Sequence, residues 1–195
     1  KKMNNKLILL LIAVLLMQFA SADIIFSDGF ESGTLGGWNL TNMAGANNWT
    51  ASTTNPYAGA RHAQSQPLST TQPASVLSIN INTLGYRDIS MFYYRRLVGI
   101  DAADEFQAEW YNGTAWTILE QTGGSGANDA SYLARNFNFS SAADNNPNFQ
   151  IKFECTAGAT SEYCRVDNIN ISGLLMLDTM PPIVTINSPA NKTYV

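Results

Sequence analysis

Residues 149–155 read Phe-Gln-Ile-Lys-Phe-Glu-Cys, with an apolar side chain at every second position. Residues 77–81, Leu-Ser-Ile-Asn-Ile, repeat the pattern. Successive side chains of a β-strand point to opposite faces, so this alternation predicts sheets with one buried and one wet face. Two such sheets bury their apolar faces against each other, which indicates a two-sheet antiparallel β-sandwich.

The rest of the chain extends this all-β prediction. Short runs rich in β-branched and aromatic residues alternate with Gly, Asn, Ser and Pro, and no long helical apolar period follows residue 22. The predicted strands are Ile24–Ser27, Trp49–Ser52, Ala60–Gln66, Ala74–Asn82, Asp88–Leu97, Asp104–Tyr111, Ala115–Gln121, Ser131–Phe139, Asn148–Cys155 and Cys164–Ser172.

One turn requires a choice of register. Asn112-Gly113 favours a two-residue hairpin, which would place Trp116 and Ile118 on the polar face. A three- or five-residue loop centred on Gly113 instead sets Trp110 opposite Trp116. Because burial of two indole rings outweighs a preferred turn type, we expect the longer loop.

The N-terminus has the three parts of a secretory signal peptide over residues 1–22. A basic start precedes the apolar run Leu7–Met17, and the small residues Ala20 and Ala22 precede a predicted cut at Asp23. The alternative is a membrane anchor, but such a run gives about 17 Å of helix against about 30 Å of hydrocarbon. We expect a helical leader that is cleaved, and no membrane insertion afterwards.

Charge and cysteine content narrow the function further. Loss of the three leader lysines lowers the net charge from −4 to −7 and leaves no basic patch, which disfavours nucleic acid as a partner. Cys155 and Cys164 fall in what the pattern indicates is a single hairpin, and in an exported chain we expect a disulfide. The six Asn-x-Ser/Thr sequons of a candidate glycoprotein are Asn39, Asn48, Asn112, Asn138, Asn170 and Asn191.

The composition changes after Gly173. We expect the sandwich to cover 23–173, a linker to cover 174–182, and 183–195 to form the first strand of an immunoglobulin-like domain. A double proline followed by an alternating strand, as in Met180-Pro-Pro-Ile-Val-Thr-Ile, is similar to the start of such repeats in bacteria and archaea.

Several motifs carry a family resemblance. Residues 26–33 read Phe-Ser-Asp-Gly-Phe-Glu-Ser-Gly, Gly37-Trp38 follows, and residues 166–171 read Val-Asp-Asn-Ile-Asn-Ile. Further matches are Trp49, Pro56–Gly59 and Ile89–Tyr94. Residues 26–173 thereby resemble the MAM-like and cleaved-adhesin-like jelly-roll domains of surface and secreted proteins. The four-cysteine framework of animal MAM domains is absent, which favours a microbial relative.

Three carboxylates form a candidate metal site. Alternation puts Asp167 on the face of Ile169, and the first and last strands of a jelly roll lie side by side, which brings Asp28 and Glu31 near it. Three hard oxygens suit a structural Ca²⁺, which related jelly-roll families often hold. The alternative is that these carboxylates accept hydrogen bonds from turn amides.

The open face of a central hairpin forms a candidate ligand site. If 88–97 pairs with 104–111, planar polar groups lie beside an aromatic ring, as in carbohydrate-binding sheets. The predicted ligand-binding residues are Tyr94, Arg96, Gln107 and Glu109. The alternative is an ordinary ion pair of Arg96 with Glu105 on a wet face.

Catalysis finds little support, because His62 is the only histidine and no Gly-x-Ser-x-Gly elbow is present. We therefore predict no catalytic residues and an extracellular, non-catalytic binding or adhesion module that recognises a glycan or a surface protein. The alternatives are an accessory domain of a larger secreted hydrolase, a peptidase or glycosidase, and a structural tile of an envelope layer.

Overall fold

A computed structural model describes residues 21–42, 49–67, 75–123 and 126–176. Apart from turns and loops, the described ranges contain strands and one short 3₁₀ helix at Ser141–Ala143. The strands are β1 (Asp23–Asp28), β2 (Asn39–Asn42), β3 (Trp49–Ser52), β4 (His62–Ser65), β5 (Ser75–Ile81), β6 (Tyr86–Val98), β7 (Glu105–Tyr111), β8 (Trp116–Gly123), β9 (Leu133–Asn138), β10 (Phe149–Thr156) and β11 (Tyr163–Leu175).

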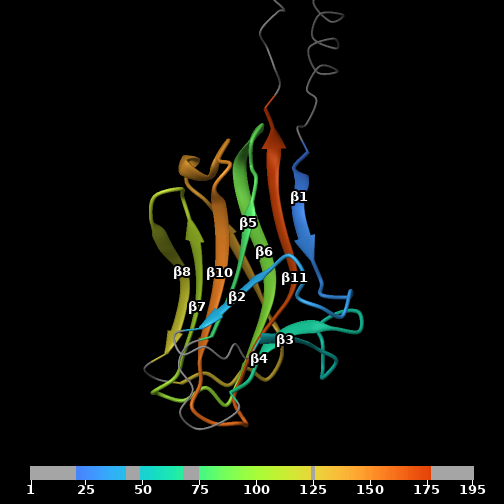
Figure 1. The fold of residues 1–195 in the computed structure, drawn as a ribbon, viewed down its shortest axis with the longest axis vertical. Helices are drawn as coiled ribbons and strands as arrows, with labels where there is room; N and C mark the ends of the chain where they lie inside the picture. Colours follow the sequence, from blue (N-terminus) through green and yellow to red (C-terminus); the bar gives the residue numbers. More distant parts are fainter. Residues whose placement is uncertain (1–20, 43–48, 68–74, 124–125, 177–195) are drawn as a thin grey trace, which may run out of the picture.

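The strands form two antiparallel sheets packed face to face, which confirms the predicted sandwich (Figure 1). One sheet has the order β3-β4-β11-β6-β9, and β1 also pairs with β11. The other has the order β2-β5-β10-β7-β8. Every predicted strand is present, and β2 is an addition that its short polar sequence did not indicate. The first and last of these strands lie side by side, as expected for a jelly roll.

The predicted pairing of β6 with β7 is wrong. β6 lies in the six-stranded sheet between β11 and β9, whereas β7 lies in the five-stranded sheet between β10 and β8. The segment between them crosses from one sheet to the other, where Gly99 adopts a φ of 70°. Each strand finds an apolar partner face across the interior, which a simple hairpin would not provide.

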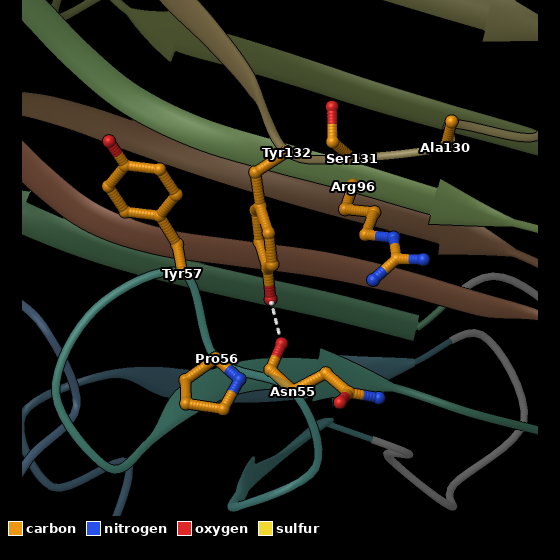
Figure 2. A pocket seen from close by; sticks show the side chains of 7 residues that line it. All are labelled: Asn55, Pro56, Tyr57, Arg96, Ala130, Ser131 and Tyr132. Atoms are coloured by element: carbon orange, nitrogen blue, oxygen red, sulfur yellow. Dashed lines mark hydrogen bonds between the residues drawn. The ribbon is translucent and has the colours of Figure 1, made fainter.

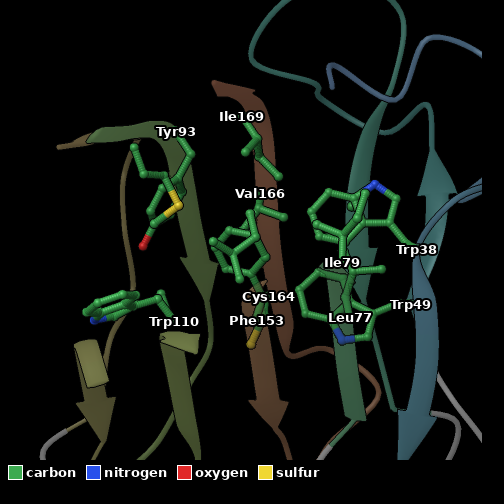
Figure 3. Packing of buried hydrophobic residues seen from close by; sticks show 14 of the residues in the cluster. Trp38, Trp49, Leu77, Ile79, Tyr93, Trp110, Phe153, Cys164, Val166 and Ile169 are labelled. Carbon is green, nitrogen blue, oxygen red and sulfur yellow. The ribbon is translucent and has the colours of Figure 1, made fainter. Parts of the chain in front are cut away.

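The core lies between the sheets and contains the predicted alternating residues (Figure 3). Leu77, Ile151 and Phe153 are fully buried, and the Trp49 indole donates a hydrogen bond to the Ser75 carbonyl at 3.1 Å. Tyr93 is also fully buried, and its hydroxyl donates to Glu120 Oε2 at 2.6 Å. Burying a large aromatic or aliphatic side chain stabilises the fold by about 1.5–3 kcal/mol.

The disulfide joins the sheets and does not staple a hairpin. Cys155 on β10 and Cys164 on β11 are bonded, with Cα atoms 6.1 Å apart, so the expected bridge is present. Its two strands belong to different sheets, however, and both cysteines are buried in the core. On the chain-entropy argument, closing so short a loop stabilises the fold by about 2–3 kcal/mol.

The β7–β8 register differs from the prediction. The turn has four residues, closed by a hydrogen bond from Asn112 N to the Ala115 carbonyl, and Tyr111 pairs with Trp116. Trp116 and Ile118 therefore lie on the outer face, 38% and 49% exposed. Trp116 has a partner there, because the Lys152 ammonium lies 4.7 Å from the centre of its ring.

The ends of the described chain bear on the predicted boundaries. β11 continues to Leu175, past the predicted boundary at Gly173. The predicted leader, apart from its last two residues, and the predicted immunoglobulin-like strand lie outside the described residues. Within the described ranges, no helix is long and apolar enough to cross a membrane.

Candidate functional site

A pocket of about 350 Å³ opens on the outer face of the six-stranded sheet (Figure 2). Its wall comes from three segments: the loop between β3 and β4, strand β6, and the segment before β9. The lining residues are Asn55, Pro56, Tyr57, Arg96, Ala130, Ser131 and Tyr132. In the view of Figure 2, Tyr132 stands between Tyr57 and Arg96, and its hydroxyl donates to the Asn55 carbonyl at 3.1 Å.

Aromatic rings form one side of this site. Tyr57 stacks on Tyr94, with ring centroids 3.4 Å apart and an angle of 17° between the planes. Tyr132 meets Tyr57 edge-on at 5.7 Å, and Phe92 meets Tyr94 edge-on at 5.0 Å. Because Tyr57 is 43% exposed, the stack ends in a ring that a ligand can reach.

Two carboxylates hold the loop that carries Tyr57. Asp167 Oδ2 accepts hydrogen bonds from the amides of Tyr57 and Ala58, at 2.9 and 3.2 Å. Glu31 accepts from the amides of Ala60 and Arg61, at 3.0 and 3.2 Å. Charge-assisted bonds of this kind are strong, so the loop is held in its middle by Asp167 of β11 and near its end by Glu31 of the turn after β1.

Gly59 explains why this loop can approach Glu31 so closely. Its φ is +62°, and a Cβ at this position would lie 2.1 Å from a Glu31 carboxylate oxygen. Any other residue would therefore push Glu31 away from the amides it binds.

A β-bulge turns Asp167 away from the core, so the prediction that it shares a face with Ile169 is wrong. The pairing of β11 with β6 shifts register between Asp167 and Asn170, and Asn168 adopts a φ of 48°. Val166 and Ile169 both point inward across the extra residue, and Asp167 points outward opposite Tyr94. Asp167 is nonetheless fully covered by the Tyr57 loop, and burial raises its pKa while the amides it binds lower it.

The carboxylates predicted to hold calcium serve other contacts. Asp28 accepts from the Phe30 amide at 2.6 Å and from the Trp38 indole at 2.8 Å, which anchors the buried opening motif. Asp28, Glu31 and Asp167 do not form a group whose carboxylate oxygens lie within 4.8 Å of one another. The turn-amide alternative describes these contacts, and calcium binding stays a prediction.

A different acidic cluster lies just past Val98 and Tyr163, the last pair of β6 with β11 at that end. Asp101, Asp104 and Glu162 are the one such group among the described residues, and the last two are buried. Burial raises the pKa of Asp104, and Glu162 accepts from the amides of Gly158 and Ala159. These bonds close the loop between β10 and β11 on itself.

A buried polar layer lies under the pocket. Arg165 is 5% exposed and donates through Nε to Gln64 Oε1 at 2.8 Å, and Gln64 also meets His62 Nε2 at 3.4 Å. His62 is fully buried beneath Tyr132, with ring centroids 6.3 Å apart. Burial, and then the positive charge of Arg165, lower the pKa of His62 to about 4, so it is neutral at pH 7.

The four predicted ligand residues divide between the two faces. Tyr94 and Arg96 belong to the pocket region, because they lie on the outer face of the six-stranded sheet. Gln107 and Glu109 lie on β7 in the other sheet, so the predicted four-residue platform does not exist. Arg96 does not pair with Glu105 either; its Nε donates to the Asp129 carbonyl at 3.3 Å, and Glu105 accepts from Gln121.

Sequence reasoning missed Arg165 and Tyr132, and it gave Tyr57 no role in binding. Tyr57 sits in a Pro-Tyr-Ala-Gly segment, typical of an exposed turn, and that signal could have indicated a presented ring. The contribution of Arg165 depends on the pairing of β11 with β6, and no local pattern reports that long-range contact.

Comparison with known proteins establishes the fold. No family profile and no curated protein matches the chain. Among solved structures, the K3 cleaved adhesin domain of Lys-gingipain from Porphyromonas gingivalis matches with a TM-score of 0.58 and 11% identity, over 78% of this chain and 99% of that domain.

Two carbohydrate-binding modules are similar to a comparable degree. The xylan-binding domain CBM22-1 of Paenibacillus barcinonensis Xyn10C gives a TM-score of 0.53 and 20% identity, over 80% of this chain and 97% of that one. TmCBM61, solved in complex with β-1,4-galactotriose, gives a TM-score of 0.56 and 9% identity, over 73% of this chain and 92% of that one. At such identities the likeness shows a shared jelly-roll sandwich and does not show a shared ligand.

Proposed function

We propose that this chain is a non-catalytic, extracellular binding module that holds a glycan in the pocket beside Tyr57. The observation that carries the proposal is an exposed tyrosine ring stacked on the sheet, next to a cavity lined by polar side chains and carbonyl groups. Sugar rings present apolar faces and hydroxyl edges, so they require this combination of ring and polar groups.

The rigidity of the site supports the same function. Asp167 and Glu31 fix the Tyr57 loop, and Tyr132 is bonded to the Asn55 carbonyl in that same loop. A preformed surface loses little conformational entropy when it binds a ligand. The similar solved structures include two modules whose descriptions name carbohydrate ligands and one adhesin domain, which agrees with a binding role.

A catalytic role has weaker support. His62 is buried below Tyr132 and neutral at pH 7. Glu109 is engaged by the Lys152 ammonium at 2.7 Å. The disulfide and the leader-like N-terminus favour an exported protein.

The test is a glycan array probed with the described domain, followed by titration of the best ligand into two variants. Tyr57→Ala removes the exposed ring and should weaken binding by about 1 kcal/mol or more. The variant also loses the stack on Tyr94, so its stability should fall by about 1 kcal/mol and it should stay folded. Trp116→Ala, which removes an exposed ring from the opposite sheet, is the matched control and should bind normally.

Two results would contradict the proposal. An array with no bound glycan would refute the function. A loss of binding in Trp116→Ala together with normal binding in Tyr57→Ala would move the site to the five-stranded sheet.

A further inference from the structure

Two arginines stand directly opposite each other on neighbouring strands below the pocket. Arg96 on β6 pairs in register with Arg165 on β11, and both side chains are on the outer face. Like charges at directly opposed positions of a sheet repel each other and destabilise it. The pKa of Arg165 reflects this repulsion. It is lowered mainly by burial and further by the positive charge of Arg96.

Within the part of the chain that the structure describes, neither arginine has a carboxylate partner. The ion pairs of the described residues belong to Arg87, Arg95, Arg135 and Lys152, and no carboxylate oxygen lies within 4.0 Å of the Arg96 or Arg165 guanidinium. Their neutral partners among the described residues are the Asp129 carbonyl at Nε of Arg96 and the Gln64 side chain at Nε of Arg165. The Arg165 guanidinium also lies 4.9 Å from the centre of the Tyr163 ring, which leaves Arg96 as the more open of the two.

The acidic groups nearby already serve other partners. Both Asp167 oxygens accept backbone amides, from Tyr57 and Ala58 on one side and Asn168 on the other. The Asp129 carboxylate binds Arg95 and the Leu97 amide. Among the described residues, a positive pair in an acidic chain of net charge −4 is therefore left without a counterion, at a face that carries a pocket.

Arg96 lines that pocket, with its guanidinium beside Tyr132 (Figure 2). Arginine presents a planar set of donors that matches a carboxylate or sulfate group, and such charge-assisted bonds are strong. Building on the proposed glycan site, we propose that its ligand is an acidic saccharide, whose carboxylate or sulfate group binds Arg96 while a sugar ring contacts the tyrosines.

The experiment compares saccharides that differ only in charge. Galacturonate trisaccharide, its carboxyl-reduced neutral counterpart of the same linkage and a sulfated galactose oligosaccharide are titrated into the domain by calorimetry. The carboxylate or the sulfate ligand should bind about tenfold or more tighter than the neutral one, the factor expected for one charge-assisted hydrogen bond. This preference should shrink as salt is raised, because added ions screen the charges.

Variants assign the preference to the arginine. Arg96→Gln should bind acidic and neutral sugars alike, and Arg96→Lys should keep part of the preference. Arg87→Gln removes the same charge from an exposed position of β6 and should behave like the unmodified domain. Melting temperatures establish that each variant is folded.

The outcomes separate the inference from the function on which it rests. Equal or tighter binding of the neutral sugar, weakened by Tyr57→Ala, would keep the glycan site and overturn the acidic ligand. A preference for acidic sugars that persists in Arg96→Gln would overturn the role of Arg96. Binding of none of the three sugars would overturn the acidic-ligand inference, and the glycan array then decides the function separately.

Discussion

The two outer faces of the sandwich differ in whether their cationic side chains have carboxylate partners. We call the outer face of the five-stranded sheet around Lys152 the lysine face, and the outer face of the other sheet around Arg96 and Arg165 the arginine face. On the lysine face, the Lys152 ammonium lies 2.7 Å from Glu109, 3.5 Å from Glu154 and 4.7 Å from the Trp116 ring centre. On the arginine face, Arg96 and Arg165 are paired in register, and neither has a carboxylate partner among the described residues.

This difference indicates which face can form new favourable contacts with a ligand. On the lysine face, Lys152 is already held by Glu109, Glu154 and the Trp116 ring, so a ligand there would break favourable contacts before making new ones. The arginine face offers unpaired donors and an exposed ring held on rigid strands. An exposed tryptophan alone is a weaker guide to a binding site, because much of any protein surface is apolar.

The largest effect that we predict separates the core from the arginine face at two consecutive residues. Tyr93→Ala should destabilise the fold by about 3–5 kcal/mol, because it empties a fully buried ring site. Tyr94→Ala removes a half-buried ring that stacks on Tyr57, and we expect a loss of about 1 kcal/mol. Chemical denaturation measures the unfolding free energy of both variants. A larger loss in Tyr94→Ala than in Tyr93→Ala would mean that Tyr94, and not Tyr93, faces the core.

A second, smaller effect is a pH dependence confined to the arginine face, because His62 is the only histidine of the chain. Its pKa is lowered to about 4 in the folded protein, so between pH 6.5 and about 4 the unfolded chain binds a proton that the folded chain does not. The free energy of unfolding should therefore decrease as the pH is lowered through this range, by up to about 3 kcal/mol.

The His62→Phe variant isolates this contribution, since other groups titrate near the lower limit. Asp167 and Asp104 have raised pKa values and act in the opposite sense just above their ordinary pKa. The difference in unfolding free energy between wild type and variant, measured from pH 7 to pH 4.5, should change with pH. A constant difference would show that His62 is protonated normally in the folded state.

The smallest effects test the charge contrast itself. Lys152→Met leaves the buried Glu109 without its cation and should cost about 1–3 kcal/mol of stability, with sugar binding intact. Arg96→Gln relieves a like-charge pair and should change stability by about 0.5 kcal/mol or less, in either direction. Thermal unfolding compares the two, and equal losses would show that the arginine face is also internally balanced.

Local pattern was enough to predict much of the fold. The alternation in residues 77–81 and 149–155 reports which side chains are buried, and the strands and the core follow from it. It does not report which strands pair. The predicted β6–β7 hairpin was wrong for this reason, because the choice between a hairpin and a crossover depends on contacts across the whole interior.

The candidate site was predicted only in part for related reasons. Tyr94 and Arg96 were placed on an outer face correctly by alternation. Asp167 was misplaced because the bulge at Asn168 shifts the alternation by one residue, and Trp116 because a four-residue turn changed its register. Such single-residue irregularities reverse the face of every residue beyond them.

The central claim is that the arginine face, and not the lysine face, binds the ligand. The most direct measurement is the change in backbone amide NMR shifts when a glycan selected on the array is titrated into the domain. The account predicts that the largest changes cluster at residues 55–57, 94–96 and 130–132. Changes clustered instead at residues 109–118 and 150–154 would contradict it.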